Sequence, residues 1–162
     1  MARLTITTAF GTCAVEWNPS GIIRFELPPE TGRGPAGAEA PPWVQSVARK
    51  VTLHLGGMLQ DFSDSRLDWS IVSAFQAEVY RQTQSIPPGH VRSYGEVARA
   101  IGLGPESARA VGVALATNPW PLLVPCHRVV SARGRMTGFS APGGIRTKTR
   151  LLALEGAELL SE

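Results

Sequence analysis

The residue pair Cys126-His127 is the part of this chain best suited to covalent chemistry. The thiolate is the nucleophilic form of cysteine, and a neighbouring base or positive charge lowers the pKa of a thiol from its free value of about 8.5. The apolar run at 122–124 predicts a short buried strand that ends at Pro125, directly before the pair. The pattern indicates an activated nucleophile at the end of a strand, and a buried, inert cysteine is the alternative.

Four sequence blocks in the C-terminal half favour the nucleophile. They are IPPG (86–89) with RSYGEVA (92–98), ARAVG (108–112), NPWPLLVPCHRVV (118–130), and GFS (138–140) followed by LLALEG (151–156). With these blocks in this order, the chain resembles the O6-alkylguanine-DNA alkyltransferases, also called methylated-DNA–protein-cysteine S-methyltransferases. The resemblance implies a DNA repair protein that moves an alkyl group, chiefly methyl, from guanine O6 in duplex DNA to Cys126. It also implies one turnover per molecule, no cofactor, and O4-methylthymine as a poorer substrate.

The resemblance assigns further roles around Cys126. A bridging water carries the thiol proton to His127, and Glu155 orients the imidazole. Asn118 braces the turn beneath the cysteine. Tyr94 packs near the extruded base and can donate a proton to the departing guanine. The alternatives are a surface glutamate at a helix end and a buried core tyrosine.

DNA contacts follow from the same resemblance. Arg109 is expected to fill the gap left by the extruded nucleotide, because a guanidinium can stack on bases and replace lost hydrogen bonds. An ordinary surface arginine is the alternative. The other expected DNA contacts are Ser93, Tyr94, Ala110, Gly112 and Arg128, the last of which either supports the site or contacts phosphate.

The expected guanine pocket combines side chains from three of the blocks. It is formed by Leu115, Pro121, Val129, Phe139 and Ser140. Phe139 stands where the family frequently has tyrosine, and Ala141-Pro142 extends the loop that borders the pocket. The range of alkyl groups that the pocket accepts is therefore left open.

Two short helices are predicted to carry the DNA contacts. Ser93 and Glu96 form a capping box that opens a helix ending at residue 100 or 101, and Gly102 suits its C-terminal end. A second helix over about 105–117 begins with a proline and contains mostly small side chains. The pair is typical of a helix-turn-helix. In the family, its second helix enters the minor groove of DNA.

The preceding chain predicts a small mixed lobe. Strands are expected at about 4–10, 12–17, 22–27 and 67–69, a loop at 28–42, and helices at 43–55 and from about 73 to the IPPG block. We expect an α+β N-terminal lobe over 1–72, a small sheet plus helix that resembles a ribonuclease-H-like fold. A mainly α-helical C-terminal lobe over 73–162 holds the helix-turn-helix and the active site. Nothing in the first lobe indicates catalysis.

Positive charge gathers in the segment that holds the cysteine. Residues 81–150 contain ten lysines or arginines and two acidic residues, whereas the whole chain has a net charge of only +3. Such a segment favours a phosphate-binding surface, and an arginine-rich solvated face is the alternative. We expect double-stranded DNA containing O6-alkylguanine as the partner.

Several classes of site and location are not indicated. Two cysteines make no disulfide framework, so Cys13 and Cys126 are expected as free thiols. The three histidines have no partners at zinc-ligand spacing, so no metal is expected, although some family members hold zinc in the N-terminal lobe. No apolar run approaches the roughly 18 residues of a membrane span. We expect a monomer in the cytoplasm, associated with the nucleoid.

Two other functions remain open. One is a non-catalytic protein that binds alkylated DNA, as members of the wider family with tryptophan at the cysteine position do. The presence of Cys126 argues against it. The other is a cysteine hydrolase, which would need a histidine and a third group from elsewhere in the fold.

Overall fold

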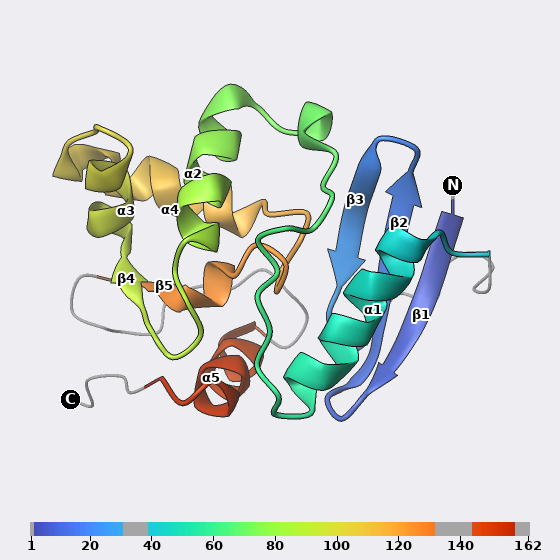
Figure 1. The fold of residues 1–162 in the computed structure, drawn as a ribbon. Coiled ribbons are helices and arrows are strands. Elements are labelled where there is room, and N and C mark those ends of the chain that lie inside the picture. Colours follow the sequence, from blue (N-terminus) through green and yellow to red (C-terminus); the bar gives the residue numbers. More distant parts are fainter. Residues whose placement is uncertain (1, 31–38, 132–143, 158–162) are drawn as a thin grey trace.

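The computed structural model describes residues 2–30, 39–131 and 144–157, which form a small antiparallel sheet with one helix beside a group of helices (Figure 1). The sheet contains β1 (Ala2–Thr8), β2 (Gly11–Asn18) and β3 (Gly21–Glu26), in that order. The predicted mixed α+β architecture is confirmed. β1 ends earlier than expected, because Phe10 lies in the hairpin turn, where its amide donates to Thr8 Oγ1 over 3.0 Å.

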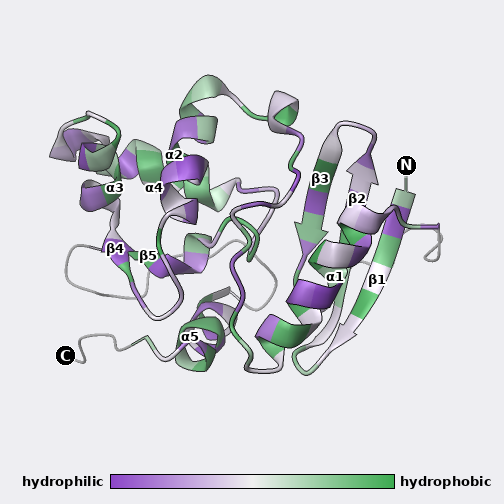
Figure 2. Ribbon diagram, in the orientation of Figure 1, coloured by the Kyte–Doolittle hydropathy of each residue, from purple (hydrophilic) through white to green (hydrophobic). Residues whose placement is uncertain are grey.

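Helix α1 (Pro42–Leu55) packs against this sheet through one apolar face. The buried residues Val44, Val47, Val51 and Leu55 recur every three or four positions, as expected for an amphipathic helix. Figure 2 shows both hydrophilic and hydrophobic segments along α1. The predicted helix at 43–55 is confirmed. His54, which is fully buried, belongs to the same helix.

The expected strand at 67–69 is wrong. Leu67 makes only an isolated bridge to Ile22, and the chain then turns into a 3₁₀ helix over Trp69–Ile71. The carboxylate of Asp68 accepts a hydrogen bond from the Ser70 amide over 3.1 Å and caps this turn. A side chain that bonds to the following backbone competes with strand pairing.

Three helices follow at the predicted places. Helix α2 (Ala74–Gln84) begins at a capping box of Ser73 and Gln76, and α3 (Tyr94–Ala100) begins at the predicted box of Ser93 and Glu96. Gly102 adopts φ 85°, the left-handed conformation that suits a helix end. Helix α4 (Ala108–Ala116) is preceded by a 3₁₀ turn over Pro105–Ser107, so its α-helical part starts later than expected.

The segment before Cys126 is a turn and not the expected strand. Leu122 has φ 77°, a left-handed conformation that a strand excludes and that non-glycine residues rarely adopt. The Val124 amide donates to the Trp120 carbonyl over 2.8 Å and closes the turn. A 3₁₀ helix, Cys126–Arg128, follows directly.

A two-stranded parallel sheet lies beside this 3₁₀ helix. β5 (Val129–Val130) pairs with β4 (Arg92–Ser93), which brings the start of α3 next to the residues after the cysteine. Strands of two residues carry no readable periodicity, which is why the sequence did not predict this sheet. Helix α5 (Gly144–Leu154) ends just before Glu155.

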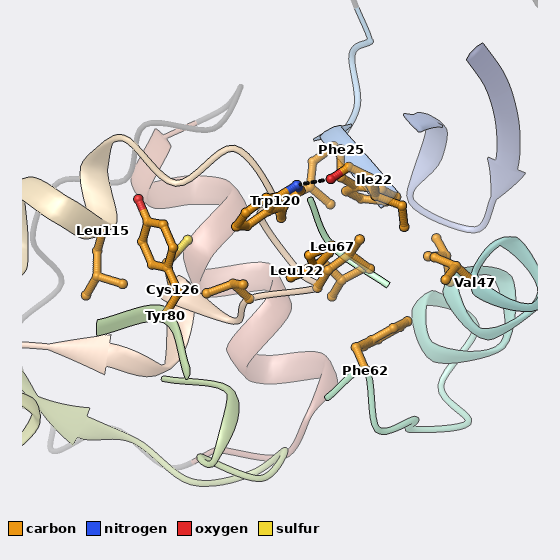
Figure 3. Packing of buried hydrophobic residues seen from close by; sticks show 14 of the residues in the cluster. Ile22, Phe25, Val47, Phe62, Leu67, Tyr80, Leu115, Trp120, Leu122 and Cys126 are labelled. Carbon is orange, nitrogen blue, oxygen red and sulfur yellow. Dashed lines mark hydrogen bonds between the residues drawn. The ribbon is translucent and has the colours of Figure 1, made fainter. Parts of the chain in front are cut away.

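The two groups of elements share one hydrophobic core. Trp120 is fully buried, and its Nε1 donates to the carbonyl of Ile22 in β3 over 2.8 Å (Figure 3). Its ring contacts Trp69 and Tyr80 edge-on, with centroids 5.3 and 6.0 Å away. Cys126 belongs to the same cluster of buried residues. No helix in the described part of the chain is long and apolar enough to span a membrane.

Candidate active site

Asn118 holds the turn that presents Cys126. Its Nδ2 donates to the Val124 carbonyl over 2.9 Å, and its Oδ1 accepts from the Trp120 amide over 2.9 Å. The same side chain also lowers the pKa of the Cys126 thiol. The structure therefore places Asn118 beneath the cysteine, where the sequence predicted it.

Cys126 is a buried thiol with several groups that favour its ionised form. Burial raises its pKa, and the side chain of Asn118, the charge of Lys148 and the backbone amides of Cys126 and His127 oppose that rise. Cys126 is only 7% exposed. The resting thiol therefore keeps its proton until a base removes it.

Cys13 has a different environment. It lies in β2 with no exposed surface, and burial raises its pKa to about 12, opposed only by the hydroxyl of Thr8. A thiol with that pKa is protonated at neutral pH and is a poor nucleophile. The structure thus distinguishes a core cysteine from one surrounded by thiolate-stabilising groups.

His127 and Glu155 lie in contact, as predicted. His127 Nε2 is 2.9 Å from Glu155 Oε2, and both side chains are fully buried. Burial alone would raise the pKa of Glu155, but hydrogen bonds from Arg128, His127 and His54 hold that pKa well below its usual range. Glu155 is therefore an ionised carboxylate and not the surface glutamate that was the alternative.

The ionised carboxylate determines which nitrogen of His127 carries the proton. A carboxylate only accepts hydrogen bonds, so Nε2 must donate, and in the neutral ring Nδ1 then keeps its lone pair. Burial lowers the pKa of His127 more than Glu155 raises it, which favours the neutral ring. Within the described residues Nδ1 has no hydrogen-bond partner. It can therefore accept a proton.

The expected DNA contact of Arg128 is corrected by the structure. Its Nε donates to Glu155 Oε1 and its Nη2 to Glu155 Oε2, each over 2.9 Å, and its Nη1 donates to the Ile86 carbonyl over 2.7 Å. The side chain is buried. A guanidinium engaged in this way cannot reach a phosphate and instead fixes the carboxylate in two-point contact.

Lys148 is a site residue that the sequence reading missed. Although almost fully buried, its Nζ donates to the Val129 carbonyl over 2.8 Å and lies 6.0 Å from the centre of the Tyr94 ring. Burial lowers the pKa of Lys148, and the nearby Cys126 raises it. Lys148 precedes Glu155 by two helical turns, a spacing that could have placed both on one face of α5.

His54 is the second missed residue, and it corrects the view that the first lobe lacks site residues. From helix α1, its Nε2 lies 2.9 Å from Glu155 Oε2, and the Gln60 amide donates to its Nδ1 over 3.0 Å. The pair is separated by 101 positions in the sequence. No local spacing could have indicated this contact.

The predicted DNA-binding residues gather at the start of α3 and along α4. Arg109 and Ala110 are exposed, while Ser93 caps α3 by accepting from the Glu96 amide over 3.0 Å. Gly112 faces Tyr94, because a Cβ at Gly112 would lie 3.8 Å from the tyrosine ring. The structure thus brings these residues together, with Tyr94 partly buried and not a core residue.

The predicted guanine pocket is only partly described. Leu115, Pro121 and Val129 are buried, whereas Phe139 and Ser140 lie outside the described residues, as does the loop around Ala141-Pro142. A cavity of about 560 Å³ opens elsewhere on the protein. It is lined by residues 60–63, 81, 84–88, 122, 123, 125 and 128, and includes none of the predicted pocket residues.

Metal-binding side chains do not cluster in the described ranges 2–30, 39–131 and 144–157. No group of three histidine, cysteine, aspartate or glutamate residues there could hold an ion. That the protein works without metal or cofactor stays a prediction.

Comparisons with known proteins place the chain among proteins that act on methylated or flipped DNA bases. Residues 74–157 match the family profile described as 6-O-methylguanine DNA methyltransferase, DNA binding domain. A methylated-DNA–protein-cysteine methyltransferase of Mycolicibacterium paratuberculosis is 44% identical over 117 residues, covering 72% of this chain and 68% of that protein. A DNA base-flipping protein of Thermus thermophilus is 38% identical and covers 94% of this chain and 98% of its own.

A solved structure extends the likeness to the whole fold. The crystal structure of Mycobacterium tuberculosis OGT in complex with DNA superposes with a TM-score of 0.79 at 32% identity. The match covers 96% of this chain and 93% of that one. The likeness therefore includes both the sheet with α1 and the helices around Cys126.

Proposed function

Because the chain belongs to the 6-O-methylguanine DNA methyltransferase family, we propose that it repairs DNA by taking the alkyl group of O6-alkylguanine onto Cys126. One observation carries this proposal: a buried thiol is followed by a histidine whose Nε2 contacts an ionised carboxylate and whose Nδ1 can accept a proton. The chemistry is nucleophilic displacement assisted by a general base.

The reaction requires proton transfer followed by one displacement. Adjacent side chains seldom form a good direct hydrogen bond, so a bridging water carries the Cys126 proton to His127 Nδ1. The sulfur then bonds to the alkyl carbon as the bond from that carbon to guanine O6 breaks, and its electrons stay with the guanine. A proton returned to the guanine leaves the normal base and S-alkylcysteine. A thioether is not readily reversed, so each molecule acts once.

Tyr94 and Lys148 are two further groups that would support the displacement. The Tyr94 ring, beside Gly112 and the ammonium of Lys148, is suited to pack on an extruded base and to donate a proton to it. The charge of Lys148 favours the Cys126 thiolate. These two groups would assist departure of guanine and formation of the nucleophile, respectively.

We propose that helix α4 promotes extrusion of the base from the duplex. Arg109 is the long cation on an exposed face of α4 that also carries Ala110, Val113 and Ala116. A guanidinium there can fill the space that the flipped nucleotide leaves. Leu115, Pro121 and Val129, with Phe139 and Ser140, are proposed to bind the extruded guanine, and O4-methylthymine is proposed as a poorer substrate.

A second candidate function is binding of alkylated DNA without transfer. The name of the Thermus thermophilus relative, a DNA base-flipping protein, favours it. The presence of Cys126 among thiolate-stabilising groups favours transfer instead. A binder would leave both protein and lesion chemically unchanged.

The test is a single-turnover assay with a duplex that carries one O6-methylguanine. We expect wild-type protein to restore guanine with a stoichiometry of one per molecule and to gain the mass of one methylene group. Cys126→Ser should bind the same duplex without repairing it, and Cys13→Ala should repair it normally. Binding by wild-type protein without any mass gain would support the second candidate and refute transfer.

The oligomeric state and the location belong to the proposal as well. We propose that the protein acts as a monomer on duplex DNA in the cytoplasm, at the nucleoid. We also propose that the chain forms two lobes, over 1–72 and 73–162, and that the first lobe has a ribonuclease-H-like fold. The sheet order β1-β2-β3 with α1 packed on it supports the latter.

A further inference from the structure

The carboxylate of Glu155 accepts hydrogen bonds from three side chains. Arg128 donates to both of its oxygens, while His54 Nε2 and His127 Nε2 each lie 2.9 Å from the same oxygen, Oε2. All four side chains are buried. Two imidazoles from different lobes therefore meet on one oxygen of the group that orients the proposed base.

The tautomer of His54 is determined by its surroundings. Its Nδ1 accepts a hydrogen bond from the Gln60 amide over 3.0 Å, so the proton of the neutral ring sits on Nε2. That proton points at an ionised carboxylate, which can only accept. Phe62 packs against the ring with centroids 5.3 Å apart and limits its rotation. His54 thus donates from a nearly fixed position.

We propose that His54 is a positioning residue for alkyl transfer. Its Nε2–H holds Oε2 of Glu155 from helix α1, so that His127 bonds that oxygen through Nε2 and keeps Nδ1 available for the thiol proton. The inference rests on the proposed function, because it assigns a role within that reaction. The first lobe then contributes to catalysis through one hydrogen bond, although it holds no group that touches substrate.

Arg128 alone does not fix the position of the Glu155 carboxylate relative to helix α1. Arg128 donates hydrogen bonds to both oxygens of Glu155 and fixes the plane of the carboxylate. Both residues, however, belong to the C-terminal half of the chain. His54 ties the carboxylate to α1, across the interface that Trp120 and Ile22 also join. Loss of the His54 donor lets Oε2 shift, and small displacements of a catalytic group reduce rates by up to about 100-fold.

The test compares two replacements of His54 that differ in one property. His54→Phe keeps an aromatic ring but removes the donor, whereas His54→Gln places an amide N–H at about the reach of Nε2. We expect His54→Phe to lower the transfer rate at saturating methylated duplex by about 10- to 100-fold, with DNA affinity within about twofold of wild type. His54→Gln should recover most of the rate.

Val51→Ala is the matched control for stability. Val51 is fully buried in the same helix, belongs to the core and has an apolar side chain that makes no hydrogen bond to Glu155, so its truncation destabilises the fold through a cavity. We expect it to lower the melting temperature and leave the rate at saturating DNA unchanged. If all three variants lose rate in proportion to lost stability, His54 is merely structural and the inference is wrong.

Nitrogen-15 NMR of the wild-type imidazoles provides a test that needs no variant. We expect the shifts of His54 to show a neutral ring protonated at Nε2. A ring protonated at Nδ1 would overturn the inference, even if His54→Phe does not fold. Wild-type transfer measured in parallel separates the two proposals: no methyl on wild-type protein refutes the function, whereas normal transfer by folded His54→Phe refutes only the role of His54.

Discussion

The two ring nitrogens of His127 have different tasks, and Glu155 assigns them. A buried carboxylate with a depressed pKa stays ionised, so it fixes the proton on Nε2 and leaves Nδ1 as a base. Arg128 offsets the cost of burying that charge. The placement of the proton on His127 therefore depends on the single negative charge of Glu155.

Glu155→Gln tests that charge. The amide removes it and can present an N–H where an acceptor is required, so we expect the transfer rate at saturating duplex to fall by about 100- to 10,000-fold, the usual range for a general base. DNA affinity should change little, because Glu155 is buried. A melting curve checks that the variant is folded, and an unchanged rate at neutral pH would remove Glu155 from the mechanism.

The pH dependence of transfer reports on His127. Burial lowers its pKa below the ordinary value of 6.5, so the ring stays neutral and able to accept a proton in mildly acidic solution. We expect single-turnover rates to hold as the pH falls through 6.5 and to decline only below it. A decline centred above that value would show that His127 is not the neutral base described here.

Helix α4 has one buried face and one exposed face, and we propose that the exposed face approaches DNA. Val111, Ala114 and Leu115 are buried, whereas Arg109 and Val113 are exposed one turn apart. The partly exposed Gly112 leaves room beside the Tyr94 ring. The small exposed residues Ala110 and Ala116 permit close approach of a partner on either side of Val113.

Arg109→Ala separates a base-replacing side chain from an ordinary phosphate contact. Extrusion costs a few kcal/mol in a duplex and little for a free base. We expect the variant to repair methylated duplex much more slowly even at saturating DNA, and to react normally with free O6-benzylguanine if the pocket admits it.

Exposed Arg99, outside the proposed site, gives a control for charge alone. Arg99→Ala should weaken binding and reduce its salt dependence by about one unit at most, with a normal rate once DNA is saturating. Recovery of the full duplex rate by Arg109→Ala under the same conditions would make Arg109 part of the basic surface only.

For the whole molecule, the positions of positive side chains and of the site residues in space differ from what their order in the sequence suggested. Arg128 and Lys148, two of the ten cations at 81–150, are buried and bonded inside the protein. The surface that faces DNA is therefore less positive than the count suggested. The site also joins segments that are far apart in the sequence, because His54 in α1 contacts Glu155 after α5.

The sequence predicted what depends on local spacing. The Ser93 capping box and the helices α3 and α4 have near-neighbour signals in the sequence, and the structure contains them. Leu122 was assigned to a strand because an apolar run gives no sign of a positive φ. The β4–β5 pairing was too short to predict, and the contact from His54 to Glu155 depends on how the chain packs as a whole.

Peptide mapping after reaction with a methylated duplex tests the central claim most directly. Cys13 and Cys126 are both buried, but Cys13 has only the hydroxyl of Thr8 to lower its pKa, whereas the pKa of Cys126 is lowered by the charge of Lys148 and by several hydrogen-bond donors. We expect one methyl group on the peptide that contains Cys126 and none on the peptide that contains Cys13. A methylated Cys13, or a repaired lesion with neither peptide modified, would contradict the account.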